Sequence, residues 1–90
     1  MRHAVELAPA AMRQLKKLPL EVRRRIYQSM EGLQTNPKPH GSIKLEVSSH
    51  LYRMRVGDYR VVYRVTDRQL LVLILKIGHR EGVYRGGRGL

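Results

Sequence analysis

Basic residues alternate with apolar residues between positions 51 and 65, in the stretch LYRMRVGDYRVVYRV. Gly57 and Asp58 form a pair typical of a two-residue turn, which predicts antiparallel strands over 51–56 and 59–66. In that register Arg55 faces Arg60, and alternate side chains share a face. One face then carries Arg53, Arg55, Arg60 and Arg64. Opposed like charges destabilise a strand pair, so we interpret this face as a phosphate-binding surface rather than a solvated sheet face.

A third strand extends the basic face. The stretch LLVLILKIG is apolar at nearly every position, which is typical of a strand buried on two faces and predicts a central strand over 70–78. A three-residue turn near Asp67 would direct Leu71, Leu73, Leu75 and Ile77 into the core. The hairpin would contribute its other face, which is Tyr52, Met54, Val56, Tyr59, Val61, Tyr63 and Val65. Lys76, and Arg80 if the strand continues, would then join the arginines.

Two amphipathic helices are predicted to cover the apolar side of this sheet. After Pro9, apolar residues recur at helical spacing at Ala11, Met12, Leu15 and Leu18, and after Pro19 at Val22, Ile26, Met30 and Leu33. The stretch NPKPHG at 36–41 ends the second helix, because prolines cannot continue it. Residues 3–7 predict a short strand beside strand 70–78. We expect one α+β domain over 1–90, with an N-terminal strand and a two-helix hairpin on a mostly antiparallel four-stranded sheet, and with 86–90 as a flexible tail.

Composition indicates a polyanionic partner. Eighteen Lys and Arg against seven Asp and Glu give a formal charge of +11. No cysteine is present, so hydrophobic burial must hold the fold, and the setting we expect is cytoplasmic. Neither a signal peptide nor a stretch long enough to span a membrane is recognisable.

Other candidate sites are weaker. His3, His40, His50 and His79 lack metal-ligand spacing, so we expect no metal. A glycine-rich nucleotide loop is absent too, and we expect no small-molecule cofactor. Asp58 and Glu81 fit a turn former and an ion-pair partner better than a catalytic pair. Residues 23–25, all arginine, are either a solvated helix face or a further RNA contact.

The order of these elements, with the motifs RVGDYRVVY and GHREGVYR, resembles the RelE/ParE superfamily of toxins from prokaryotic toxin–antitoxin modules, and the second motif resembles its RelE branch. The resemblance implies a microbial-RNase-like fold and a ribosome-dependent mRNA endonuclease. In such an enzyme the 2′-hydroxyl of an mRNA nucleotide in the ribosomal A site attacks the adjacent phosphate. It also implies neutralisation by an antitoxin that wraps around the toxin, here expected to be acidic and RelB-like.

The resemblance also suggests site residues. The family's two strand lysines correspond to Arg53 and Arg55, its hairpin arginine to Arg60, its C-terminal arginine to Arg80 and its tyrosine to Tyr84, while His79 occupies another basic position. Arg60 and Arg80 would hold the scissile phosphate, and Arg53, Arg55, Arg64 and Lys76 would bind RNA. Since a guanidinium cannot accept a proton near neutral pH, proton transfer falls to His79 or Tyr84.

Two further interpretations remain open. A ParE-like protein would inhibit DNA gyrase by binding and would perform no chemistry, and such chains generally lack the full basic set. The other interpretation is an inactive relative that only binds nucleic acid. The basic residues together with Tyr84 favour a metal-independent endoribonuclease.

Overall fold

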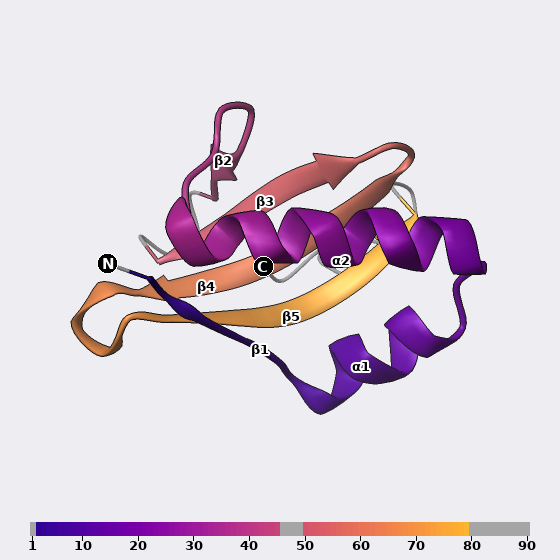
Figure 1. Ribbon diagram of the computed structural model, residues 1–90, viewed down its shortest axis with the longest axis horizontal. Helices are drawn as coiled ribbons and strands as arrows, with labels where there is room; N and C mark the ends of the chain where they lie inside the picture. The colour runs from indigo at the N-terminus through magenta and orange to yellow at the C-terminus, as the bar shows by residue number, and fades with distance from the viewer. Residues whose placement is uncertain (1, 46–49, 80–90) are drawn as a thin grey trace.

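The described part of the chain forms a five-stranded sheet with two helices packed against it (Figure 1). The computed structural model describes residues 2–45 and 50–79. The elements are β1 (Ala4–Leu7), α1 (Pro9–Lys16), α2 (Leu20–Thr35), β2 (Ile43–Lys44), β3 (Leu51–Val56), β4 (Tyr59–Thr66), a 3-10 turn (Asp67–Gln69) and β5 (Leu71–His79). The sheet order is β1-β5-β4-β3-β2, and only β1 with β5 is a parallel pair. The predicted α+β architecture is confirmed, with a fifth strand, β2, that is too short for alternation to reveal.

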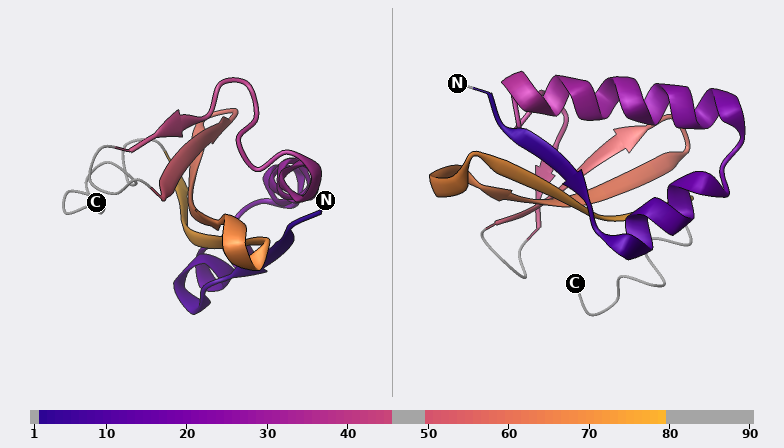
Figure 2. Two further views of the ribbon diagram at one scale, coloured as in Figure 1. Left: turned by 90° about the vertical axis from the view of Figure 1, so that its left-hand side faces the viewer. Right: turned by 60° about the horizontal axis from the view of Figure 1, so that its bottom comes forward.

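Both helices bury one apolar stripe against the sheet, and the two views of Figure 2 show α2 running along one of its faces. Ala11 and Leu15 of α1 are buried, as are Ile26, Met30 and Leu33 of α2. Met12, which we expected to be in the core, is 44% exposed, because it lies one residue further round α1 than Ala11. Neither described helix is long and apolar enough to cross a membrane.

The hairpin between β3 and β4 has the predicted register. Arg55 lies opposite Arg60, Arg53 opposite Val62 and Leu51 opposite Arg64. Gly57 has a φ of 59°, a backbone conformation that glycine adopts without the steric cost of a side chain. Met54, Val56, Val61, Tyr63 and Val65 are buried in the core, and Tyr52 and Tyr59 pack against it. The two faces are therefore divided as the sequence predicts.

The face assignment within β5 is partly wrong. The turn before β5 has four residues rather than three, because Thr66 pairs with Leu71, and this directs Val72 and Ile74 into the core. A β-bulge between Val62 and Tyr63 then shifts the register, so Ile77 reaches the core as predicted. Leu71, Leu73 and Leu75, expected in the core, are only partly buried and lie outside the core cluster. The bulge also keeps Lys76 opposite Val62, on the arginine face as predicted.

The loop after α2 is fastened to the sheet by a buried tyrosine. Tyr63 is fully buried, and its hydroxyl donates a hydrogen bond of 3.0 Å to the carbonyl oxygen of Pro37. Burial raises the pKa of Tyr63 to about 12, so the phenol stays neutral and remains a donor at physiological pH. This contact fixes the loop that leads into β2.

A second set of contacts joins the same part of this loop to the residue before β1 and to the turn before β5. His3 Nε2 lies 3.1 Å from Asp67 Oδ1, and Lys38 Nζ lies 3.5 Å from Asp67 Oδ2. The hydrogen bond from His3, followed by the charge of Lys38, lowers the pKa of Asp67. The three residues connect β1, the loop after α2 and the turn between β4 and β5.

Candidate nucleic-acid interface

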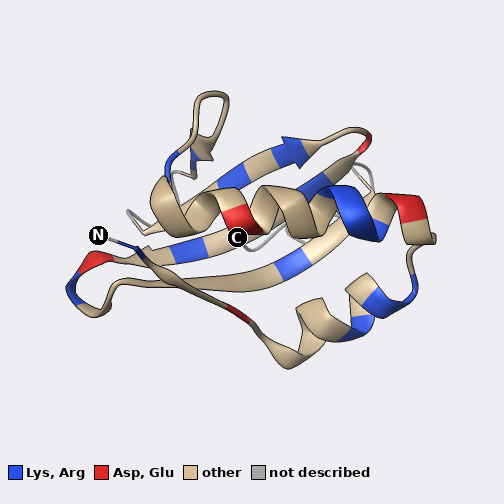
Figure 3. Ribbon diagram, viewed as in Figure 1, with Lys and Arg blue, Asp and Glu red and all other residues tan. Residues whose placement is uncertain are grey.

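Figure 3 shows basic positions on three neighbouring strands, β3, β4 and β5. The pairing register places four of these side chains on the sheet face opposite the core. We call them the basic face: Arg53, Arg55, Arg60 and Lys76. Arg55 and Arg60 are directly opposed, and Val62 lies between its partners Arg53 and Lys76. Directly opposed side chains have Cβ atoms about 4.5–5.5 Å apart, so this face concentrates like charge within reach of one phosphate group or two adjacent ones.

The basic face is anchored to the sheet rather than fully solvated. Arg53, Arg60 and Lys76 are half-buried, while Val62 between them is only 1% exposed. Long basic side chains bury their aliphatic stems over apolar neighbours and keep the charge in water. Arg55 is exposed, and its Nε donates a hydrogen bond of 3.4 Å to the carbonyl oxygen of Gly57. A surface of this kind presents charges at fixed spacing.

Arg64 lies at the margin of the basic face. It is exposed and pairs with Leu51 on one side and Leu73 on the other. It follows Val62 on the same face, one side-chain repeat further along β4. Arg64 can therefore contact an RNA backbone that extends from the basic face, but it is not among the directly opposed charges.

His79 lies on the other side of the sheet. Val61 and Ile77 pair and are both buried in the core, so Tyr59 and His79, the next pair on that face, lie on the helix side. The two rings meet edge to face, with 5.6 Å between their centroids. The structure therefore brings Arg53, Arg55, Arg60 and Lys76 together and places His79 apart from them.

Arg80, Glu81 and Tyr84 lie outside the described residues. Their predicted roles stay predictions. Among the residues that are described, no group of three or more His, Asp or Glu side chains could hold a metal ion.

Two positioning residues were not identified from the sequence. The Oε1 of Gln14 in α1 accepts a hydrogen bond of 2.7 Å from the backbone N–H of Ile77, which holds the end of β5 against α1. Arg25 of α2 reaches the hairpin turn, since its guanidinium lies 3.5 Å from the place where a side chain on Gly57 would begin. A polar residue at a helical position carries no sign of the strand that it contacts, so neither contact has a sequence signal.

Comparisons with known proteins agree with this architecture. Residues 5–84 match the family described as ParE toxin of type II toxin–antitoxin system. Toxin RelG of Mycobacterium tuberculosis is 30% identical over 86 residues, which cover 94% of this chain and 99% of the relative. RelE1 of Methanocaldococcus jannaschii is 34% identical over 88 residues, covering 94% and 98% of the two chains.

Solved structures give the same result. The archaeal RelE–RelB complex of Pyrococcus horikoshii contains a chain that is 34% identical, with a TM-score of 0.80 and coverage of 89% of this chain and 97% of that one. The toxin–antitoxin complex RelBE2 of Mycobacterium tuberculosis gives 27% identity and a TM-score of 0.78, with coverage of 89% and 100%. This chain therefore belongs to the RelE/ParE superfamily of toxins from type II toxin–antitoxin systems.

Proposed function

We propose that this toxin is a metal-independent endoribonuclease that cleaves mRNA in the A site of the ribosome. The observation that carries the proposal is the convergence of Arg53, Arg55, Arg60 and Lys76 on one face of a rigid sheet. The similarity to relatives named RelE and RelG supports the same branch of the superfamily.

The proposed reaction is attack of an mRNA 2′-hydroxyl on the adjacent phosphate. An internal nucleophile needs orientation and stabilisation of the charge that develops on the phosphate oxygens, and fixed guanidinium groups supply both. Arg60 would hold the scissile phosphate together with Arg80, and Arg53 and Arg55 would position it. Arg64 and Lys76 would bind the flanking RNA backbone.

Proton transfer in the proposed reaction requires residues other than the arginines. Arginine keeps its proton near neutral pH, so the basic face can stabilise charge but cannot act as a general base. Of the two candidates, His79 lies on the helix side of the sheet against Tyr59. This position argues against direct contact with a phosphate bound on the opposite face. We therefore assign proton transfer to Tyr84 ahead of His79.

The proposed partners are the ribosome with its mRNA and an acidic RelB-like antitoxin, so the site of action would be the cytoplasm. The formal charge of +11 suits all three polyanionic partners. The similar solved structure from Pyrococcus horikoshii is a RelE–RelB complex, which supports an antitoxin partner for this chain. We expect the chain to co-purify with a protein rich in Asp and Glu. The rate at which the two proteins associate should fall as the salt concentration rises.

A second candidate function is inhibition of DNA gyrase by binding. The description of the matching family, which names ParE, favours it. The two functions are separated by adding the purified chain to ribosomes programmed with a defined mRNA, and in parallel to a gyrase supercoiling reaction. We expect new mRNA ends, mapped by primer extension, and unchanged supercoiling. Intact mRNA together with blocked supercoiling would reverse the assignment.

A further inference from the structure

β1 covers only the first part of β5. Leu7 is the last paired residue of β1 and lies opposite Ile74, and the Ala8 N–H then donates a hydrogen bond of 2.8 Å to the Ile74 carbonyl oxygen. Pro9 follows and begins α1, so the strand ends there. β5 itself continues over residues 75–79. On this side those residues have no strand partner within the described part of the chain.

Gln14 of α1 supplies the acceptor that a strand would supply on this uncovered side. The backbone N–H of Ile77 donates a hydrogen bond of 2.7 Å to Gln14 Oε1. Ile77 is 1% exposed and Gln14 is half-buried, so water could not readily replace this acceptor. Loss of the oxygen would leave a buried N–H without a partner, which destabilises this part of the strand.

The hydrogen bond to α1 lies just beyond an irregular point in β5. The register between β4 and β5 shifts between Val62 and Tyr63, and the β-bulge leaves Leu75 without a partner on β4. A bulge disrupts the ladder locally and bends the strand. β5 thus loses regular pairing with β4 at the same place where it loses β1. The bond to α1 fixes the strand again after this point.

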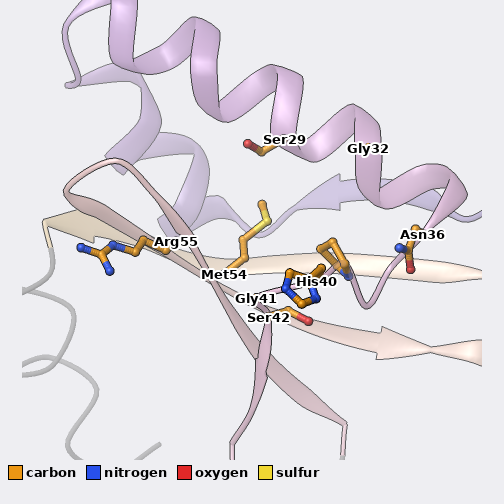
Figure 4. A pocket seen from close by; sticks show the side chains of 9 residues that line it. Ser29, Gly32, Asn36, His40, Gly41, Ser42, Met54 and Arg55 are labelled. Carbon is orange, nitrogen blue, oxygen red and sulfur yellow. The ribbon is translucent and has the colours of Figure 1, made fainter.

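A contact on the helix side of the sheet can reach the basic face only through the backbone of a strand. Neighbouring side chains of a strand point to opposite faces. At the cleft between α2 and β3, Figure 4 shows Met54 pointing toward α2 and the Arg55 guanidinium extending away from the cleft. Ile77 is likewise buried in the core on the helix side. Gln14 therefore cannot touch RNA on the opposite face, and any effect on that face passes through β5.

The backbone beside Ile77 sets the spacing of two basic side chains. Because the Ile77 N–H points toward α1, the backbone groups of its neighbours Lys76 and Gly78 point toward β4. Gly78 lies opposite Arg60. A shift of this segment would therefore change the distance between Lys76 and Arg60 on the basic face. The chain also continues directly from this segment to Arg80.

We propose that Gln14 is a positioning residue for mRNA cleavage, which fixes the end of β5 and thereby the spacing between Lys76 and Arg60. This role rests on the proposed function. Groups that stabilise developing charge must be in place before the reaction, and a small displacement of them slows the chemical step. Binding of RNA depends on the charges and much less on their exact spacing. Loss of the Gln14 oxygen should therefore lower the maximal rate and leave the affinity for the programmed ribosome nearly unchanged.

A purely structural role for Gln14 leads to a different expectation. Loss of a contact that only stabilises the fold would lower the melting temperature, but the molecules that remain folded would cleave mRNA at the wild-type rate. The maximal rate measured well below the melting temperature therefore separates the two roles.

Variants at position 14 test the role of the acceptor oxygen. Gln14→Met keeps the length of the side chain and removes the oxygen, and Gln14→Ala removes the oxygen as well, so the comparison remains if one of them does not fold. Gln14→Glu keeps an acceptor in the same place, and all of these residues are good helix formers. Gln28→Met, the same replacement at an exposed position of α2, is the matched control. Thermal unfolding verifies that each variant is folded at the assay temperature.

Hydrogen exchange and cleavage are measured for each chain. Exchange at the Ile77 amide reports whether the hydrogen bond is present. Single-turnover cleavage on programmed ribosomes, over a range of toxin concentrations, gives the maximal rate and the concentration that produces half of it.

For Gln14→Met and Gln14→Ala we expect exchange at Ile77 to be about ten-fold faster or more. The maximal rate should fall by roughly 10- to 100-fold, and the half-saturating concentration should stay within about two-fold of the wild-type value. Gln14→Glu and Gln28→Met should match the wild type in the exchange rate, the maximal rate and the half-saturating concentration.

Equal maximal rates for the wild type and Gln14→Met would overturn the proposal and leave the nuclease in place, and so would unchanged exchange at Ile77. A loss in Gln14→Glu as large as that in Gln14→Met would also overturn it, because the acceptor would then not be what matters. A higher half-saturating concentration at an unchanged maximal rate would overturn it by assigning Gln14 to binding. Intact mRNA with the wild-type chain would instead refute the nuclease itself, and with it any role of Gln14 in cleavage.

Discussion

At the scale of single residues, the face of the sheet on which a side chain lies decides what that side chain can contact. Because side chains in a strand repeat with a period of two, the turn at Gly57 and Asp58 fixes the neighbours of Arg53, Arg55 and Arg60. The same rule places His79 with Tyr59 on the helix side. The family resemblance located His79 in the site by its position in the sequence, which carries no information about the face.

Arg60→Ala should abolish most mRNA cleavage without unfolding the chain. Loss of one group that stabilises transition-state charge typically costs about 10²- to 10³-fold in rate. Stability should not fall much, because Arg60 faces the like charge of Arg55 and lies outside the core. Single-turnover cleavage on programmed ribosomes measures the rate, and melting temperature measures stability. The matched control is Arg68→Ala, an exposed arginine in the turn before β5. Equal rates for Arg60→Ala and wild type would remove Arg60 from the site.

His79→Ala should have a smaller effect, of less than about ten-fold. A general acid or base contributes about 10²- to 10⁴-fold, so this variant separates direct proton transfer from a contact with Tyr59. The same single-turnover assay is repeated between pH 6 and pH 8. We expect the pH profile to be unchanged in His79→Ala. A 100-fold loss, with the disappearance of a titration in the histidine range, would show that His79 reaches the phosphate after all.

At the scale of elements, the sequence predicted each long strand and helix to within a few residues, since prolines and apolar spacing mark their ends. It did not predict β2, or the faces of Leu71, Leu73 and Leu75 in β5. A β-bulge inserts one residue without changing composition, and an entirely apolar strand gives no alternation from which to detect it. The position of the loop after α2 was equally hidden, because it depends on the hydrogen bond that Tyr63 donates to that loop.

Gly32→Ala should stabilise the chain by about 1 kcal/mol, because alanine is the better helix former and the added methyl group meets no neighbour within 4 Å. A change of this size raises the melting temperature by roughly 4–8 °C in a domain of 60–100 residues. Circular dichroism during heating measures it. A lower melting temperature would mean that the fold needs glycine at position 32.

At the scale of the whole molecule, charge is the dominant property. A formal charge of +11 in 90 residues costs stability through self-repulsion, and binding to the proposed polyanionic partners would give that cost a function. Binding to single-stranded RNA should weaken steeply with salt. Removal of one phosphate contact, as in Lys76→Ala or Arg64→Ala, should reduce the slope of log affinity against log salt by about 0.7. Arg13→Ala, on the exposed side of α1, is the control and should leave the slope unchanged.

The proposed cleavage of mRNA depends on an internal 2′-hydroxyl held on the basic face. The most direct measurement compares two mRNAs on programmed ribosomes that differ only by a 2′-deoxy substitution at the nucleotide before the cleaved bond. We expect rapid cleavage of the all-ribose mRNA, a product with a 2′,3′-cyclic phosphate, and no cleavage of the substituted mRNA. Equal cleavage of both mRNAs, or cleavage of neither, would contradict it.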